Sequence, residues 1–465
     1  MVVLRTVAAF ALAAATVAVA QSSQQKCGPG SKCPADSPCC SSYGNCGTGA
    51  YCLGGCDPKS SFNLQSCMPA PVCKSGDFAL NTLNDVSPNT VYLGDASKAN
   101  WVSSGSPAVY QNQAMLLTMA PNTVGTLLSS THYMWYGKVG ATITTSQGQG
   151  VVTAFILMSD VKDEIDYEWV GVDLGNAQSN YYFQGITNYQ NGQNLSVSNT
   201  VKNSHRYEIT WSPDQIDWSI DGQVRRTLKK SDTYNDTSKS YHYPQSPARV
   251  QFSLWPAGLP QNGEGTISWA GGLVNWDSPY MENGYYYAMI KDVSIDCYDA
   301  PSGSGSGSVY KYTSEAGTQD AIQLTNDNSV LASFQANGNN QQYNPNAKPS
   351  GTSTSSSGPK PTVNNDNTVP GMVGAGSFSN DAQSNSGGNV AADGSSSGST
   401  GSSTGSSPGS SSSGTSGSSG SSGNTGSGGF SQGTTGSSGS TGEGSRVVAG
   451  SLVALVAFLG AAMMI

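Results

Sequence analysis

Short apolar runs that alternate with polar positions recur throughout residues 77–298, and no long stretch of helical spacing competes with them. β-Branched and aromatic residues fill the runs, and Asp-Gly, Asn-Gly and Ser-Pro pairs separate them. Alternation with a period of two, bounded by turn residues, predicts β-strands and an all-β sandwich or barrel. The clearest candidates are VVTAFILMS at 151–159, RYEITWS at 206–212, QIDWSIDG at 215–222, RVQFSLWP at 249–256 and GTISWAGG at 265–272.

One predicted strand, DEIDYEWVG at 163–171, concentrates acidic residues in a chain of which only 11% is charged. Side chains alternate along a strand, so its acids after the first share one face and its apolar residues share the other. The apolar face, Ile165, Tyr167 and Trp169, is expected to pack in the core. The acidic face carries Glu164, Asp166 and Glu168. Like charges on one face of a strand repel each other and destabilise it, so we expect these three residues to have a function.

The spacing of the two glutamates suits glycosidic bond cleavage. Their Cα atoms are about 13 Å apart at roughly 3.3 Å per residue, and side chains that lean together reduce the carboxyl separation to about 5–6 Å. That separation is typical of a retaining glycosidase, in which one carboxylate attacks the sugar and the other protonates the leaving oxygen. Asp166 lies between them and can help to keep the pair in opposite protonation states.

Both ends of the chain carry targeting signals. Residues 1–20 combine one Arg, an apolar run and a closing Ala-Val-Ala, the pattern of a secretory signal peptide. Residues 447–465 form an apolar tail without a basic segment beyond it, preceded by small residues near Ser437, Ser438 and Gly439. This pattern favours a GPI anchor signal over a spanning helix. We therefore expect an extracellular protein in the cell wall and on the outer face of the plasma membrane.

The amino-acid composition of the rest of the chain indicates a stalk, a linker and two folded parts. Residues 351–445 are mostly Ser, Gly, Thr and Asn, which cannot bury enough apolar surface to fold, so we expect a disordered stalk there. Residues 301–350, which include GSGSGS, are interpreted as a linker. A Cys-rich module at 27–67 and the large domain at 77–298 complete the layout.

Several features restrict the partners. Ten cysteines fit an oxidising compartment, and Asn194 and Asn235 begin N-glycosylation motifs. The net charge of −9 comes without a basic block, which argues against nucleic acid as a partner. The three histidines form no metal-like cluster, and we expect no metal, no cofactor and a monomer.

The Cys-rich module needs disulfides, because eight cysteines within 27–67 leave little apolar material for a core. A zinc cluster is the alternative, but the segment has no histidine. The spacing CC, five residues, Cys, five residues, Cys resembles the hevein-type chitin-binding domain, the family 18 carbohydrate-binding module. This resemblance implies the pairs Cys27–Cys40, Cys33–Cys46, Cys39–Cys52 and Cys56–Cys67.

Two cysteines remain outside that set and flank the large domain. We expect Cys73–Cys297, with Cys67–Cys73 as the competing bridge. The hevein resemblance also implies that Ser41, Tyr43 and Tyr51 bind N-acetylglucosamine chains. Asn45 stands where an aromatic residue is expected, so we expect weak chitin binding, and a purely structural module remains the alternative.

The segment Glu-Ile-Asp-Tyr-Glu within DEIDYEWVG resembles the ExDxE signature of glycoside hydrolase family 16, which implies a concave β-jelly roll. The combination with a hevein-type module, a Ser-rich stalk and an anchor signal is similar to the fungal Crh class of cell-wall transglycosylases. The resemblance implies that Glu164 is the nucleophile, Glu168 the general acid/base and Asp166 the assisting acid. It also implies cleavage of chitin and transfer of the fragment to β-glucan.

Aromatic side chains are candidates for sugar subsites, and we select Tyr182, Trp255 and Trp269. Two other functions stay open. A family 16 endo-β-glucanase would use the same carboxylates on another glycan. A non-catalytic chitin-binding wall protein would depend on the Cys-rich module alone, and the complete set of Glu164, Asp166 and Glu168 argues against it.

Overall fold

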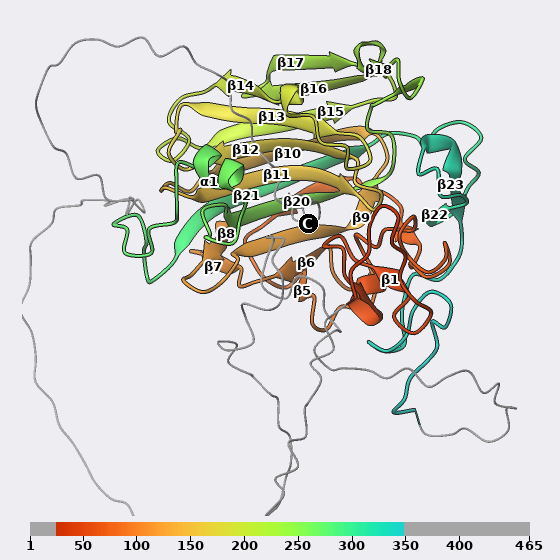
Figure 1. Ribbon diagram of the computed structural model, residues 1–465. Helices are drawn as coiled ribbons and strands as arrows, with labels where there is room; N and C mark the ends of the chain where they lie inside the picture. The colour runs from red at the N-terminus through yellow and green to blue at the C-terminus, as the bar shows by residue number, and fades with distance from the viewer. Residues whose placement is uncertain (1–24, 348–465) are drawn as a thin grey trace, which may run out of the picture.

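The computed structural model describes residues 25–347. Two eight-stranded sheets, whose neighbouring strands are mostly antiparallel, make up most of the fold (Figure 1). We call them the β12 sheet and the β10 sheet. The β12 sheet has the order β14 (Gln193–Ser196), β13 (Asn176–Tyr182), β12 (Glu164–Val170), β11 (Val151–Ser159), β20 (Ala248–Pro256), β9 (Thr126–Met134), β6 (Trp101–Ser104) and β5 (Val86–Pro88). The β10 sheet has the order β17 (Gln223–Lys229), β16 (Gln215–Ile220), β15 (His205–Trp211), β10 (Gly137–Thr144), β21 (Tyr286–Cys297), β8 (Ala114–Met119) and β7 (Ala108–Tyr110), with β4 (Gly76–Ala79) also on β21.

The core lies between these two sheets, as in a jelly-roll-like sandwich. The β12 sheet contributes Phe155, Tyr167 and Phe252, and the β10 sheet contributes Ile209 and Trp218. Aromatic rings meet across the interface, for example the Trp169 and Tyr207 rings, whose centroids are 4.5 Å apart at an interplanar angle of 65°. The expected all-β class is confirmed, and it follows from the alternation of apolar and polar positions along the strands.

Five of the six strands named from the sequence form at the expected places, as β11, β12, β15, β16 and β20. The sixth does not: of residues 265–272, expected as a strand, the first five belong to the helix α1 (Glu264–Trp269). The buried positions explain the difference. Thr266 and Ala270 are buried and Trp269 is half-buried, while Ser268 is exposed. Spacings of three and four residues match a helix, whereas a strand would bury alternate positions.

The segment 301–347, expected as a linker, is instead part of the folded body. Strands β22 (Val309–Tyr312) and β23 (Ile322–Thr325) form a three-stranded sheet with β3 (Ala70–Pro71), and the 3-10 turn η4 (Gln319–Ala321) lies between them. Further on, Leu331 and Ala336 are buried against the Cys-rich module. The Gly/Ser run at 303–308 suggested a linker, but the apolar residues that follow it supply enough apolar surface to pack against the rest of the fold.

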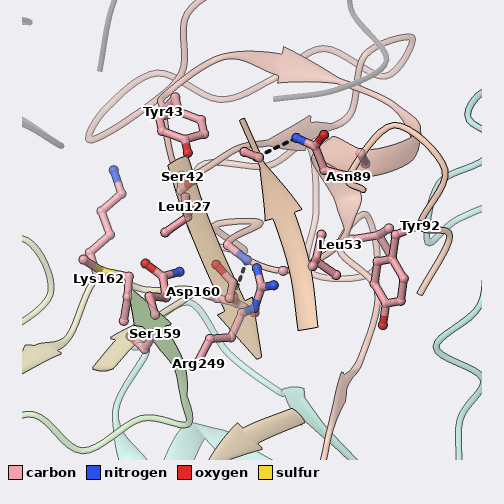
Figure 2. A pocket seen from close by; sticks show the side chains of 18 residues that line it. Ser42, Tyr43, Leu53, Asn89, Tyr92, Leu127, Ser159, Asp160, Lys162 and Arg249 are labelled. Atoms are coloured by element: carbon pink, nitrogen blue, oxygen red, sulfur yellow. Dashed lines mark hydrogen bonds between the residues drawn. The ribbon is translucent and has the colours of Figure 1, made fainter. Parts of the chain in front are cut away.

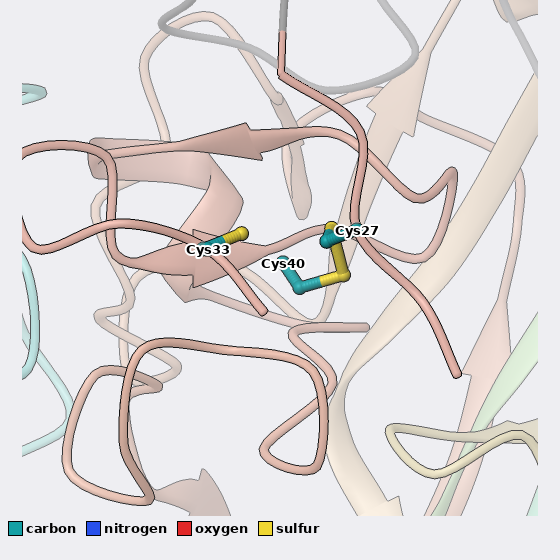
Figure 3. Close-up of side chains that lie close together, drawn as sticks. All are labelled: Cys27, Cys33 and Cys40. Atoms are coloured by element: carbon teal, nitrogen blue, oxygen red, sulfur yellow. A yellow bond between two sulfur atoms is a disulfide. The ribbon is translucent and has the colours of Figure 1, made fainter. Parts of the chain in front are cut away.

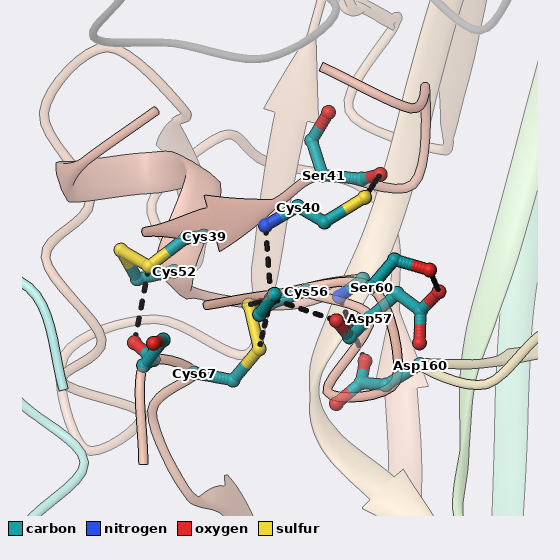
Figure 4. Close-up of a disulfide and its surroundings, with 12 residues drawn as sticks. Cys39, Cys40, Ser41, Cys52, Cys56, Asp57, Ser60, Cys67 and Asp160 are labelled. Atoms are coloured by element: carbon teal, nitrogen blue, oxygen red, sulfur yellow. Dashed lines mark hydrogen bonds between the residues drawn. A yellow bond between two sulfur atoms is a disulfide. The ribbon is translucent and has the colours of Figure 1, made fainter. Parts of the chain in front are cut away.

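The Cys-rich module contains β1 (Cys39–Cys40), β2 (Cys46–Gly47) and the 3-10 turn η1 (Gly49–Cys52). Short pieces complete the described chain: η2 (Tyr189–Asn191), η3 (Lys230–Thr233), β18 (Tyr234–Asn235) and β19 (Ser240–Tyr241). The structure forms the five disulfides Cys27–Cys40, Cys33–Cys46, Cys39–Cys52, Cys56–Cys67 and Cys73–Cys297. Figure 3 shows the first of them, and Figure 4 shows Cys39–Cys52 and Cys56–Cys67. The Cys73–Cys297 disulfide closes the ends of the large domain, so the alternative Cys67–Cys73 bridge does not form.

Within residues 25–347, no helix is long and apolar enough to cross a membrane. The expected signal peptide at 1–20, the stalk at 351–445 and the anchor signal at 447–465 lie outside the described residues.

Candidate active site

The three acids selected from the sequence project from β12 to one side of its sheet. Their neighbours on the same strand, Ile165, Tyr167 and Trp169, belong to the core between the sheets. Because side chains alternate along a strand, Glu164, Asp166 and Glu168 point away from that core. Trp218 anchors the strand from the core side, since its Nε1 donates a hydrogen bond to the backbone oxygen of Asp166 at 3.0 Å.

The fourth acid of the run has a structural role. Asp163 precedes β12 and accepts hydrogen bonds from the backbone N–H groups of Gln184 (2.9 Å), Gln245 (2.9 Å) and Ser246 (3.0 Å). The Ser246 hydroxyl adds a fourth at 2.6 Å. Asp163 thus ties two distant loops to the start of the strand that carries the acids. The charge crowding of DEIDYEWVG therefore combines one structural carboxyl with a cluster of three.

The acidic cluster is removed from solvent. The exposed fractions of Glu164, Asp166 and Glu168 are 2%, 0% and 1%. Burial disfavours the charged forms and raises the pKa of all three carboxyls, to about 7 for Asp166 and well above the usual value for both glutamates. The negative charge of Asp166 raises the pKa of each glutamate further. The cluster thus shares its protons, so an ionised carboxylate and a protonated carboxyl coexist within it.

Two residues that sequence reasoning missed favour a charged Asp166. Burial raises the pKa of Asp166, and the nearby Arg226 guanidinium and Asn180 side chain both lower it. Asn180 lies directly opposite Asp166 in the pairing of β12 with β13. Arg226 stacks over the Trp218 ring, with its Cζ 4.4 Å from the ring centroid. Asn180 lies two residues before Tyr182, which the sequence selected, but only the strand register shows that Asn180 is the partner of Asp166.

The Glu168 end of the cluster is aromatic. Burial raises the pKa of Glu168, and the neighbouring Trp255 side chain opposes that shift. The rings of Trp255 and Trp269 have centroids 6.2 Å apart. Trp269, on α1, donates from Nε1 to Gln178 Oε1 at 2.9 Å, and Gln178 is the direct β13 partner of Glu168. Both tryptophans proposed from the sequence thus lie at the acids, although Trp269 comes from a helix.

The Glu164 end carries Tyr182, the third aromatic residue proposed from the sequence. Tyr182 is the direct β13 partner of Glu164 and is buried. Burial, followed by the negative charge of Glu164, raises the pKa of the Tyr182 hydroxyl, which therefore stays protonated and can donate a hydrogen bond. On the other side of β12, Met158 of β11 is the partner of Glu164.

The candidate chitin-binding residues of the Cys-rich module are not gathered on an open face. Tyr51 is only 2% exposed and packs in a cluster with Leu331 and Ala336. Ser41 is buried, and its Oγ accepts a hydrogen bond from the backbone N–H of Asn45. Tyr43 alone lines a cavity between the module and the β12 sheet (Figure 2). The segment 329–343 covers the module, and the sequence pattern had not indicated this.

The remaining candidates divide by location. Asn194 is exposed on the edge strand β14, and Asn235 is half-buried on β18.

The sulfur atoms of Cys27, Cys33 and Cys40 lie close together (Figure 3). Each of them belongs to a disulfide, so this group offers no thiolate to a metal ion.

Comparison with known proteins points to one family. Residues 95–271 match glycosyl hydrolases family 16. Crh-like protein 3 of Botryotinia fuckeliana is 55% identical over 332 residues, which cover 71% of this chain and 73% of that protein. Crh-like protein 2 of Aspergillus fumigatus is 54% identical over 335 residues, which cover 71% of this chain and 75% of that protein. A solved Crh5 transglycosylase in complex with NAG is 28% identical, covers 58% of this chain and all of that one, and has a TM-score of 0.47.

Proposed function

Because the chain belongs to the Crh-like proteins of glycosyl hydrolases family 16, we propose that it is a retaining transglycosylase that cleaves chitin and transfers the fragment to β-glucan. Membership of family 16 makes it an enzyme of the glycosidase and transglycosylase class. The observation that best supports the proposed chemistry is the cluster of Glu164, Asp166 and Glu168 on one face of β12, buried beside aromatic residues.

In the first step, the Glu164 carboxylate attacks the anomeric carbon of the donor sugar. Glu168, whose raised pKa keeps it protonated, gives its proton to the leaving glycosidic oxygen. The bond between the anomeric carbon and that oxygen breaks, and a glycosyl ester on Glu164 forms. Tyr182 is the β13 partner of Glu164, and its protonated hydroxyl can donate a hydrogen bond to this carboxylate.

In the second step, the glycosyl ester is transferred to an acceptor. Glu168, now ionised, takes the proton of the acceptor hydroxyl, and the acceptor oxygen displaces Glu164 from the anomeric carbon. Two displacements return the original β configuration. A sugar hydroxyl as acceptor gives a new glycosidic bond, and water gives hydrolysis. Half-buried Trp269, backed by the buried Trp255 ring at the Glu168 end, offers a flat apolar face to a sugar acceptor, which favours transfer over hydrolysis.

We also propose that the protein acts outside the cell, held at the membrane by a GPI lipid. Five disulfides support an oxidising compartment. The signals at 1–20 and 447–465 would direct export and anchoring. Mass spectrometry of the mature C-terminus tests this, since an anchored protein has lost 447–465 and a retained tail would contradict the proposal.

The enzymatic proposal is tested by incubating the protein with chitin oligomers and a fluorescent β-glucan oligosaccharide. We expect a joined, fluorescent product from the wild type. Glu208→Gln is a matched control, because Glu208 is a partly buried carboxylate on β15 that pairs with Lys138 at 2.9 Å, away from β12. The control should keep transfer while Glu164→Gln abolishes it. A wild type that joins no chitin fragment to the glucan would refute the proposed substrates.

A further inference from the structure

A cavity lies between the Cys-rich module and the β12 sheet (Figure 2). The module side of its wall consists of Ser42, Tyr43, Ala50, Leu53, Gly54 and Gly55. The sheet side includes Val102, Leu127, Ser129, Met158, Arg249 and Gln251. The module and strands from much later in the chain thus line one cavity.

The strand register places the sheet side of this cavity on the same face as the acids. Met158 is the direct partner of Glu164, and Arg249 is the direct partner of Met158. One step further along these strands, Gln251 pairs with Ile156, which itself pairs with Asp166. Directly paired residues point to the same side of a sheet. The cavity is therefore a lateral continuation of the face that carries Glu164.

The module is held rigidly at this position. Gly55 donates its backbone N–H to Asp160 Oδ1 at 2.8 Å, and the Tyr133 hydroxyl donates to the same oxygen at 2.8 Å. Lys59 donates to Gln184 Oε1 at 2.6 Å. The Arg249 guanidinium packs directly on Gly54, so a Cβ at this position would force the guanidinium to shift. These contacts tie the module to the loop after β11 and to β20, so the module wall is a fixed part of the cavity.

The lining is mainly apolar, with a few polar groups and the charged side chains of Asp160, Lys162 and Arg249. Tyr43 and Tyr92 supply aromatic rings, and Leu53, Leu127 and Met158 supply apolar surface. Asn89, Gln251 and Arg249 supply polar groups that can bond hydroxyl and acetamido groups. Convergence of a few polar groups on a mainly apolar concave wall is typical of small-molecule sites. Arg249 lies near enough to Tyr43 to lower the pKa of its hydroxyl, although burial raises that pKa to about 12.

We propose that this cavity is a distal subsite for the donor chain and that Tyr43 of the Cys-rich module is one of its sugar-contacting walls. The proposal rests on the proposed glycan-cleaving function and makes the module part of the catalytic groove. The occupant is the chitin-type fragment that stays on the enzyme. Glu164, which lies beside the cavity, bonds to that fragment, whereas Glu168, at the far end of the cluster, serves the departing and incoming sugars.

The test uses the full chain and compares kcat/KM for a short and a long chitin oligomer at a fixed, saturating concentration of glucan acceptor. For Tyr43→Ala we expect the ratio of long-oligomer to short-oligomer kcat/KM to fall about tenfold, the effect of losing roughly 1.4 kcal/mol of contact with the distal sugars. Tyr43→Phe keeps the ring face and should retain most of the ratio. Ser42→Trp should lower the ratio by filling the cavity.

Phe62→Ala is the matched control, because Phe62 is an aromatic residue of the same module that is 45% exposed and does not line the cavity. Its ratio should equal that of the wild type. Thermal unfolding of each variant separates misfolding from loss of the subsite. An unchanged ratio in folded Tyr43→Ala and Ser42→Trp would overturn the subsite, as would an effect confined to the KM for the glucan acceptor. A wild type that cleaves no chitin oligomer would instead refute the proposed function.

Discussion

Leu331→Ala tests whether the C-terminal segment 329–343 is an integral part of the fold. Leu331 is 2% exposed and packs with Tyr51 and Met68 in the core of the Cys-rich module. Its backbone N–H also donates to the carbonyl of Leu93 at 2.8 Å, which ties this segment to the large domain. Truncation of a buried leucine removes apolar burial and leaves a cavity, which costs about 2–5 kcal/mol. The segment is held by few other apolar contacts, so most of this cost should appear as local opening.

Amide hydrogen exchange followed by mass spectrometry measures that opening directly. A loss of about 2–4 kcal/mol corresponds to a protection factor that is lower by roughly 30-fold to several hundred-fold, since 1.4 kcal/mol is a factor of ten. The effect should be concentrated in peptides from 329–343, and strands such as β11 should keep their protection. Val91→Ala, at a side chain that is 61% exposed, is the control and should change nothing measurable. Unchanged exchange of 329–343 in Leu331→Ala would show that the segment does not depend on this packing, and the reasoning would fail.

Three further predictions concern the carboxyl groups and their neighbours. Burial raises the pKa of Asp160 to about 6, so the folded protein binds the proton of this carboxyl more tightly than the unfolded chain does. As the pH rises from 4 to 6, the free energy of unfolding of the wild type should therefore fall by up to about 3 kcal/mol. Asp160→Asn keeps an oxygen that accepts from Gly55 and Tyr133 but does not titrate. In urea unfolding at pH 4 and pH 7, the free energy of unfolding of this variant should fall less with pH than that of the wild type. An equal fall in both proteins would contradict the assignment. Asp166→Asn should retain part of the transfer activity and displace the pH profile of kcat/KM, because Asp166, with its pKa raised to about 7, is coupled to both glutamates; a profile identical to that of the wild type would exclude this coupling. Trp269→Phe should weaken transfer more than cleavage, because it removes the hydrogen bond to Gln178 beside Glu168; equal losses in both assays would argue against a role at the acceptor side.

The sequence predicted the placement of the β12 side chains more completely than that of the residues around them. Alternation alone places Glu164, Asp166 and Glu168 on one face and Tyr167 on the other, since this pattern depends only on local backbone geometry. The role of Asp163 depends on Gln184 and Gln245, which come from loops far along the chain. No local pattern reports such contacts.

The same limit applies to the aromatic residues. Tyr182, Trp255 and Trp269 were proposed because sugar sites need flat apolar faces, and the register of the strands then places them at the acids. Trp269 was expected on a strand, because a short apolar run does not distinguish strand from helix. The sequence did not indicate Asn180 or Arg226 as neighbours of Asp166. Asn180 affects Asp166 through strand pairing, and Arg226 acts through its charge from the other sheet.

The Cys-rich module shows where a family resemblance reaches its limit. The spacing of its cysteines implied four disulfides that the structure contains. The same resemblance implied an open chitin-binding face, but Leu331 and Ala336 cover Tyr51. A module's internal pairing follows from its own sequence, whereas the exposure of its surface depends on what the rest of the chain places against it.

The account depends most on Glu164 as the nucleophile, and capture of the glycosyl-enzyme tests it most directly. In Glu168→Gln, a chitin oligomer with a very good leaving group can still glycosylate Glu164, but without its general base the enzyme transfers the fragment slowly. Mass spectrometry of protein quenched during turnover should therefore show a mass increase equal to one donor fragment. Peptide mapping should place the adduct on Glu164. Turnover without any adduct, an adduct on another residue, or the same adduct in the Glu164→Gln Glu168→Gln double variant would contradict the proposed mechanism.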